Sequence, residues 1–203
     1  MKKAVALILS LALLVCLSGC SSEKGTVSEP EEYVITLYAV ENLAENRIKT
    51  KEITVTGKYS EQKLILELSR MMGISFDVEI ACFLYPPLKE GEPARIEYTS
   101  VGFSKESSLF AEALPEKQNE NFTFSDLNAR RWAILDSIWM TLKENMGKPG
   151  GISEYKNTYL DDQVSVRFAA LGSPEKPLYL EGLTPVDTIP MDTAYQGSTS
   201  FLK

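Results

Sequence analysis

Residues 126–146 read DLNARRWAILDSIWMTLKENM and form the clearest helical pattern of the chain. The apolar side chains recur at helical spacing over an arc of about 160°, which predicts a helix with one broad buried face. Ser125 is expected to cap the start of this helix, and Gly147 is expected to end it. Arg131 projects from inside the apolar arc, whereas Arg130 is expected on the polar face.

A second helix is predicted over residues 60–72, with Ser60 as its N-cap, Gly73 as its terminator and Leu66 pointing away from its apolar face. Alternating and β-rich segments predict strands at 33–40, 51–56, 77–85, 94–101, 154–160, 163–171 and, at an edge, 178–183. Asp161-Asp162 is expected to form a hairpin turn. The expected fold is therefore α+β, an antiparallel or mixed sheet with two main helices, a pattern consistent with two strand–helix half-units.

The N-terminus has the organisation of a secretory signal. Lys2 and Lys3 precede an apolar run over residues 4–17, and small residues then lead to Cys20 in the sequence Leu-Ser-Gly-Cys. The apolar run is shorter than the ~20 residues that a membrane-spanning helix needs. This ending resembles the lipobox of bacterial lipoproteins. The resemblance implies cleavage between Gly19 and Cys20, a lipid on Cys20, and an extracytoplasmic protein that is lipid-anchored to the bacterial membrane.

We therefore expect three regions: a signal peptide (1–19), a lipidated N-terminus and polar tether (20–32), and a single α+β domain with a Pro-rich C-terminal segment (33–203). Removing residues 1–19 takes the chain from 203 residues and a net charge of −7 to 184 residues and −9. This acidity argues against nucleic acid or an anionic lipid surface as a partner.

The residue types present exclude several kinds of catalytic site. The chain has no histidine, which removes Ser-His-Asp and Cys-His machinery and His-based zinc sites. Ser60 and Lys63 have the S-x-x-K spacing of penicillin-binding transpeptidases, but the other motifs of that class are missing, and a capping serine is the preferred interpretation. Cys82 stands in an apolar run and is interpreted as a small buried side chain. We expect no enzyme activity, no cofactor and no metal site.

Arg131 and Trp132 are the candidate binding residues. Trp132 and Trp139 are seven residues apart on the predicted helix and could stack on wall sugars, although aromatic residues at this spacing usually belong to the core. Arg131 could bind an anionic ligand. The preferred interpretation is an internal carboxylate partner for Arg131, because a buried cation without a partner is very costly.

Several segments resemble a GerMN-type domain. VITLYAV and TKEITVTGKYSEQKLILELSRMMG are similar to its opening, and ARIEYTSVGFS, ARRWAILDSIWMTLKEN and YKNTYLDDQVSV are similar to its second half. The resemblance covers about residues 33–185. It implies a lipoprotein of a spore-forming bacterium, associated with sporulation or germination and with cell-wall binding.

The leading hypothesis is a membrane-anchored, non-catalytic envelope module that binds peptidoglycan or an envelope protein, with the membrane itself as a partner through Cys20. One alternative is a cell-wall hydrolase or accessory that acts through carboxylates, since two-carboxylate sites need no histidine. Another alternative is a small solute-binding lipoprotein.

Overall fold

The structure, a computed structural model, describes residues 32–42, 44–57, 59–85, 89–90, 95–146 and 164–202. Within it, Glu32–Lys203 form one unit by their internal contacts. Gly19, Cys20, the strand expected at 154–160 and the turn expected at Asp161-Asp162 lie outside the described residues. None of the described helices is both long enough and apolar enough to cross a bilayer.

The first two strands form a hairpin. β1 (Glu32–Asn42) pairs antiparallel with β2 (Arg47–Thr56). In the turn between them, Asn46 adopts a φ of 49°, a left-handed conformation that asparagine tolerates better than most residues. The expected strands at 33–40 and 51–56 are confirmed, and both are longer than predicted. Ile35, Leu37 and Ala39 alternate along β1 and, with Val40, form one wall of the core.

Helix α2 (Glu61–Met72) follows its sequence signals closely. The Ser60 hydroxyl accepts a hydrogen bond from the Lys63 backbone N–H, as an N-cap does. Gly73 ends the helix with φ 66°, and a Cβ there would lie 2.8 Å from the Asn119 side-chain nitrogen. The left-handed conformation therefore favours glycine here, and a side chain would also displace Asn119. Leu66 is 48% exposed, as its place off the apolar face predicted.

The next strands form a mixed sheet. β3 (Val78–Tyr85) pairs antiparallel with β4 (Arg95–Phe103), and β4 pairs parallel with β5 (Val166–Ala170). Two short strands, β6 (Leu178–Tyr179) and β7 (Thr188–Ile189), make a separate pair. Single 3-10 turns occur at η1 (Ser108–Phe110) and η3 (Ser198–Ser200). The α+β class with two main helices is confirmed, and among the described residues the strands divide into three separate sheets.

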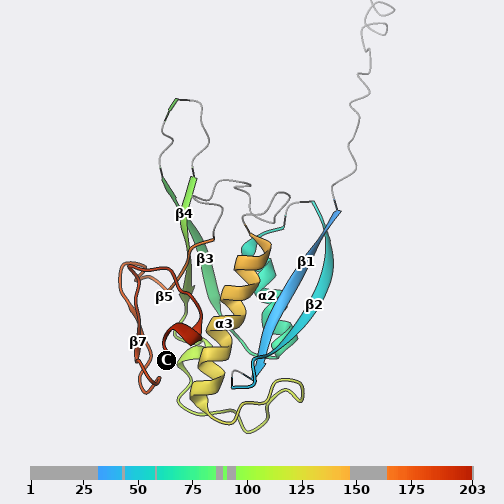
Figure 1. The fold of residues 1–203 in the computed structure, drawn as a ribbon, viewed down its shortest axis with the longest axis vertical. Coiled ribbons are helices and arrows are strands. Elements are labelled where there is room, and N and C mark those ends of the chain that lie inside the picture. Colours follow the sequence, from blue (N-terminus) through green and yellow to red (C-terminus); the bar gives the residue numbers. More distant parts are fainter. Residues whose placement is uncertain are drawn as a thin grey trace, which may run out of the picture. The chain divides into compact units, whose positions relative to one another are not determined.

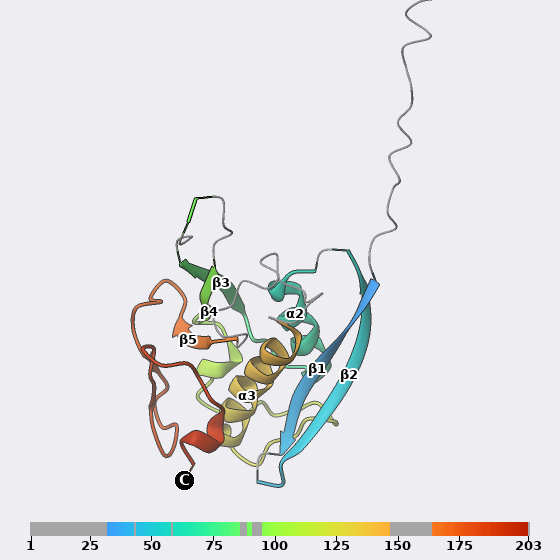
Figure 2. The same cartoon turned by 45° about the horizontal axis from the view of Figure 1, so that its top comes forward.

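Helix α3 (Leu127–Asn145) lies between the β1–β2 hairpin and the β3–β4–β5 sheet, as two views show (Figures 1 and 2). Because it contacts structure on both sides, it is buried all round over residues 130–138 rather than along one arc. The expected polar face is therefore wrong, and Arg130 is only 7% exposed. The N-cap is Asp126 and not Ser125, since the Asp126 carboxylate accepts a hydrogen bond from the Ala129 N–H.

Polar side chains of α3 bind the free edge of β1. At four-residue intervals along the helix, Ser137, Thr141 and Asn145 accept hydrogen bonds from backbone N–H groups at two-residue intervals along the strand. The three bonds are each 2.9 Å long and come from Val40, Tyr38 and Thr36. The Asn145 amide also donates to the Thr36 carbonyl at 2.7 Å. This polar ladder explains why a core helix carries buried polar residues.

Candidate functional site

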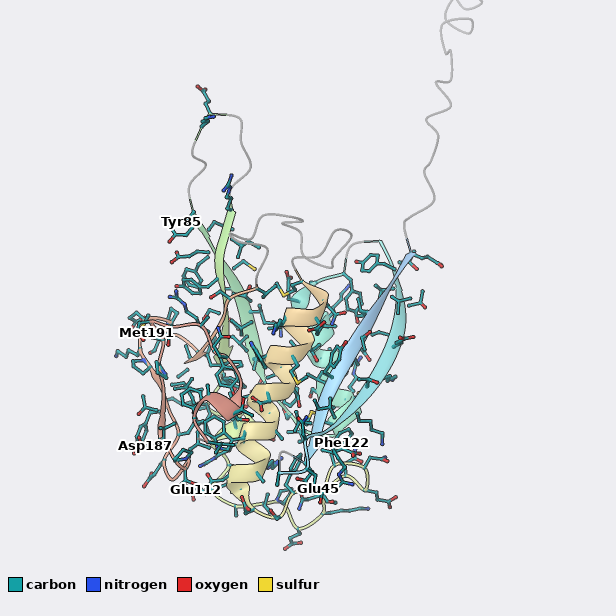
Figure 3. All side chains as sticks on the ribbon, in the orientation of Figure 1. Glu45, Tyr85, Glu112, Phe122, Asp187 and Met191 are labelled. Atoms are coloured by element: carbon teal, nitrogen blue, oxygen red, sulfur yellow. The ribbon has the colours of Figure 1, made fainter. Side chains whose placement is uncertain are left out.

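A pocket of about 610 Å³ lies at the N-terminal end of α3. Its walls come from the end of β1 and the turn after it, the loop before α3, the first two turns of α3, and two C-terminal positions. Hydrogen-bonding groups and apolar groups share the lining, which is formed by Glu41, Asn42, Ala44, Arg47, Thr123, Phe124, Ser125, Asp126, Asn128, Ala129, Trp132, Thr184 and Leu202. The labelled side chains of Glu45 and Phe122 mark this end of the molecule in Figure 3.

The loop before α3 is held in place by amide contacts. Gln118 binds both backbone groups of Phe124: its oxygen accepts from the N–H at 2.8 Å, and its nitrogen donates to the carbonyl at 3.0 Å. Asp126 then caps α3, and its second carboxylate oxygen accepts from the Ser125 hydroxyl at 2.9 Å. These hydrogen bonds lower the pKa of Asp126, so this carboxylate stays ionised as a fixed acceptor.

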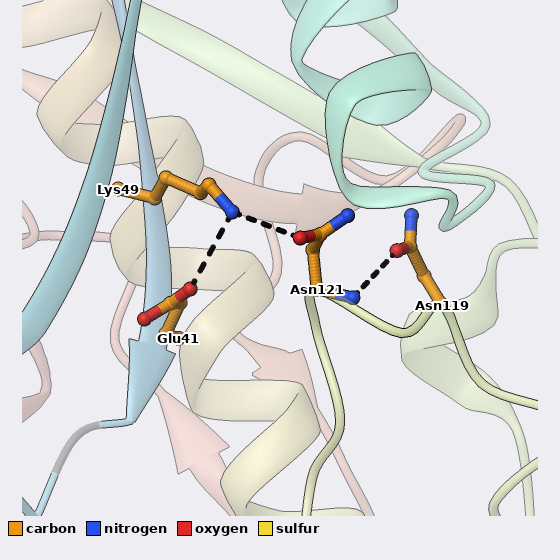
Figure 4. A network of polar contacts seen from close by, with 4 residues as sticks. All are labelled: Glu41, Lys49, Asn119 and Asn121. Carbon is orange, nitrogen blue, oxygen red and sulfur yellow. Dashed lines mark hydrogen bonds and ion pairs between the residues drawn. The ribbon is translucent and has the colours of Figure 1, made fainter.

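A polar network joins this loop to the β1–β2 hairpin (Figure 4). The Lys49 ammonium donates to the Asn121 side-chain oxygen at 3.1 Å and lies 3.8 Å from a Glu41 carboxylate oxygen. The Asn119 side-chain oxygen in turn accepts from the Asn121 N–H at 2.9 Å. Glu41 is therefore oriented from one side by Lys49, while the Glu41 side chain also lines the pocket.

Asn128 and Trp132 are fixed by the same residue of the C-terminal region. The Asn128 amide nitrogen donates to the Thr184 hydroxyl at 3.1 Å, and the Trp132 indole N–H donates to the Thr184 carbonyl at 2.9 Å. The Asn128 side-chain oxygen is buried and has no hydrogen-bond donor among the described residues. This amide is therefore enclosed by the wall of the pocket, with its nitrogen bound to Thr184. Trp132 is 2% exposed and stacks on Phe201, so it serves as a wall.

The C-terminal segment is held against α3 by a buried carboxylate. Asp136 accepts hydrogen bonds from the Tyr195 hydroxyl at 2.6 Å, from the Ser198 N–H at 2.8 Å and from the Ser198 hydroxyl. Burial raises the pKa of Asp136, and these hydrogen bonds partly oppose that shift. Gly197 packs on Trp139, where a Cβ would lie 3.0 Å from the indole ring. This attachment brings Leu202 to the rim of the pocket.

The Arg131 guanidinium is fully engaged with the protein backbone. Its guanidinium donates to three backbone carbonyls, those of Leu109 at 3.1 Å, Ala111 at 2.9 Å and Glu181 at 2.7 Å. The expectation of an internal carboxylate partner is therefore wrong, because loop carbonyls satisfy the cation instead. Burial lowers the pKa of Arg131, and the charge of Glu181 partly offsets that effect.

Other predicted chemistry resolves into structural roles. Cys82 is half-buried rather than buried, with its sulfur 3.8 Å from the Thr99 hydroxyl oxygen, and burial raises the pKa of its thiol. Ser60 caps α2, as the structural interpretation of the S-x-x-K spacing predicted. In the part of the chain that the structure describes, no three His, Cys, Asp or Glu residues gather as metal ligands would.

Of the two candidate binding residues, the structure places Trp132 in the pocket and Arg131 outside its lining. Sequence reasoning missed Glu41, Asn42, Asn128 and Thr184, because they are single polar residues in segments far apart along the chain. Comparison with protein-family models, with curated protein sequences and with solved structures found no match to this chain.

Proposed function

We propose that this chain is a lipid-anchored extracytoplasmic lipoprotein whose domain is a non-catalytic module that binds the glycan strands of the cell wall. The pocket at the N-terminal end of α3 supplies the site. Its lining combines carboxylates, amides and hydroxyls with apolar side chains, which suits a ligand that has hydroxyl groups and apolar ring faces.

The observation that carries this proposal is the mixed lining of the pocket. It brings the carboxylates of Glu41 and Asp126 and the hydroxyls of Thr123, Ser125 and Thr184 together with the apolar side chains of Phe124 and Leu202. Ligand hydroxyls can donate to the carboxylates and can both donate to and accept from the protein hydroxyls. A polyhydroxylated ligand therefore matches this lining more completely than a purely anionic or apolar one.

The pocket is better suited to binding than to hydrolysis. A glycosidase needs a carboxylic acid that holds a proton near neutral pH, with a second carboxylate facing it. Asp126 has a lowered pKa, and its two oxygens accept hydrogen bonds from Ala129 and Ser125. Asp136 has a raised pKa, but its oxygens are engaged by Tyr195 and Ser198. The hydrolase alternative therefore lacks a free proton donor at these two carboxyls.

The envelope location rests on the N-terminal sequence. The Leu-Ser-Gly-Cys ending supports a lipid on Cys20 and cleavage after Gly19. The resemblance to GerMN-type domains adds sporulation or germination as the biological setting. Metabolic labelling with a clickable fatty acid tests the anchor: the wild-type chain should be labelled and Cys20→Ser should not. Equal labelling of both chains would contradict lipid attachment at Cys20.

Glycan binding is tested by calorimetry on the full chain in lipid nanodiscs, with a tetramer of N-acetylglucosamine as the probe. Ala44 is exposed and lines the pocket, so Ala44→Trp should fill it and abolish binding. Asn128→Ala should weaken binding by about tenfold, which corresponds to about 1.4 kcal/mol.

Ala81→Trp is the matched control, because Ala81 is also an exposed alanine but lies on β3 outside the pocket. It should bind the tetramer as the wild type does, and thermal melts should show that all variants fold. Binding that survives Ala44→Trp unchanged, or no binding by the wild type, would contradict the proposal.

A further inference from the structure

The outer face of the β3–β4–β5 sheet is a second candidate surface. Residues alternate between the two faces of each strand. One face points into the core, where Val101, Phe103 and Phe168 are at most 1% exposed. The strand pairing places the opposite side chains in cross-strand rows: Glu79, Gly102 and Ala169; Ala81, Ser100 and Arg167; and Phe83 with Tyr98.

A groove of about 430 Å³ runs over this outer face. Its floor consists of small residues from the three strands, Ala81, Ser100, Gly102 and Ala169. Leu171 forms one wall and is 43% exposed, and a Cβ on Gly102 would lie 3.4 Å from it. Phe83 bounds the groove from β3. A floor this flat accommodates an extended chain with small side chains and excludes bulky ones.

A stack of three side chains crosses the sheet beside the groove. The Phe83 and Tyr98 rings are 4.5 Å apart and nearly parallel, at 14°. The Arg167 guanidinium carbon lies 3.8 Å from the Tyr98 ring centre, a close cation–π contact. A terminal nitrogen of Arg167 lies 3.9 Å from a Glu97 carboxylate oxygen, which is beyond hydrogen-bond distance. The Tyr98 ring therefore positions this cation, and its terminal N–H groups can donate to an anion.

Two opposite charges, Glu79 in the lining of the groove and Arg167 beside it, are complementary to a zwitterion. Glu79 is exposed on β3, and Arg167 is on β5 one row further along. Two strand spacings and a two-residue rise place their Cα atoms about 12 Å apart. An extended peptide covers about 3.4 Å per residue, so three to four residues span this distance.

We propose that the groove binds a short extended peptide with small side chains, a free C-terminal carboxylate and a free amino group. Arg167 pairs with the carboxylate, Glu79 pairs with the ammonium group, and methyl side chains rest on Ala81 and against Leu171. This site goes beyond the proposed glycan site and shares no residue with it.

The probe is tetra-alanine with both termini free, titrated into the full chain in nanodiscs. The wild type should bind it, and amidation of the peptide's C-terminus should weaken binding by at least about tenfold. In Arg167→Gln, the free and amidated peptides should bind equally weakly, because the partner of the carboxylate is gone. Acetylation of the peptide's N-terminus should likewise weaken binding to the wild type. In Glu79→Gln, the free and acetylated peptides should bind equally weakly, because the partner of the ammonium group is gone.

Ala81→Trp should abolish peptide binding, and Ala44→Trp should leave it unchanged. The N-acetylglucosamine tetramer should show the reverse pattern, so failure of one site is distinguishable from failure of the other. Should a tryptophan variant fail to fold, the comparison of free and amidated peptide on the wild type still decides. Equal affinity for both peptides would overturn the proposal. Two other results would also overturn it. One is that the groove binds a fatty acid instead of the peptide, and the other is that the chain self-associates through the groove and Ala81→Trp removes this association.

Discussion

β1 and β3 each have one edge that pairs with no other strand, and a helix hydrogen-bonds to each of these edges to a different extent. At β1, three side chains of α3 pair with alternate residues along the strand. At β3, one side chain of α2 does so: Gln62 accepts from the Ile80 N–H at 3.1 Å and donates to the Val78 carbonyl at 2.6 Å. Backbone groups that face the free edge of β3 recur at every second residue, so the next ones after Ile80 belong to Cys82. Among the described residues, no group pairs with the Cys82 backbone at this edge.

The difference has a geometric cause. Four helical residues rise about 6 Å, and two strand residues rise about 6.7 Å. A helix that runs along a strand edge can therefore match it at successive i, i+4 positions, as Ser137, Thr141 and Asn145 do. On α2, Gln62 is in the first turn, and the next residue at this interval, Leu66, is apolar and exposed. The contact between α2 and the β3 edge therefore stops after one amide.

This comparison separates the surroundings of the pocket from those of the groove. The polar ladder ends at Val40, directly before Glu41 and Asn42 of the pocket, and the same helix supplies Asn128 and Trp132. The pocket is therefore built on two elements that are fixed to each other. The groove lies on the face of the other sheet, whose outer strand is bound by α2 only through Val78 and Ile80.

The largest loss of stability is expected from removing the residue that fastens α3 to its surrounding loops. Arg131→Ala leaves the carbonyls of Leu109, Ala111 and Glu181 without donors and should cost about 3–5 kcal/mol. Urea denaturation of the full chain measures this. Arg130→Ala is the neighbouring control, because the Arg130 guanidinium has no backbone-carbonyl acceptor among the described residues. A cost for Arg131→Ala below that of Arg130→Ala would refute the structural role of Arg131.

Asn145→Leu should cost about 2–4 kcal/mol, because Thr36 loses partners for both its N–H and its carbonyl in a partly buried place. Gln62→Leu removes the same kind of amide pair at an exposed position of α2 and should cost about 1 kcal/mol. Parallel urea melts give both values. If the two costs are equal, the two edges are equally closed and the comparison fails.

The sequence predicted the parts of this fold that depend on local signals. Ser60, Gly73 and the alternation along 51–56 and 77–85 predicted the right elements, because caps and period-two patterns act within a few residues. The single buried face predicted for α3 was wrong, because packing on two sides is a property of the whole fold. The partners of Arg131 were unpredictable for the same reason, since Leu109, Ala111 and Glu181 meet only in the folded chain.

The candidate site was predicted only through Trp132. Asp126 had a local signal as a helix cap, but Ser125 carried a similar one, and the choice between them depends on the backbone of the preceding loop. Asn128 has no local signal, because its unpaired oxygen exists only once Thr184 and the C-terminal segment cover it.

A smaller effect is expected in the pH dependence of the free energy of unfolding. Asp126, at the start of α3, and Asp136, at its centre, should contribute to it in opposite directions. Asp136 has a folded pKa above its ordinary value of 3.8, so its contribution to stability is full below 3.8 and is lost as the pH rises through the folded pKa. Asp126 has a folded pKa below 3.8, so its contribution is present above 3.8 and is lost as the pH falls.

Relative to Asp136→Asn, the wild type should therefore gain stability as the pH falls from 7 toward 4. Relative to Asp126→Asn, the wild type should lose stability as the pH falls below 4. Urea melts of the three chains across this range measure both trends. Parallel trends for the two variants would show that Asp136 is not held in a desolvated site.

The most direct test of the central claim is an NMR titration of the ¹⁵N-labelled full chain in nanodiscs with the N-acetylglucosamine tetramer. We predict that the largest shifts occur at the Asn128 side-chain amide and at backbone amides around Ala44 and Asp126, with little change at Ala81. Shifts concentrated on β3, or a silent Asn128 amide at saturating tetramer, would contradict the assignment of this pocket as the glycan-binding site.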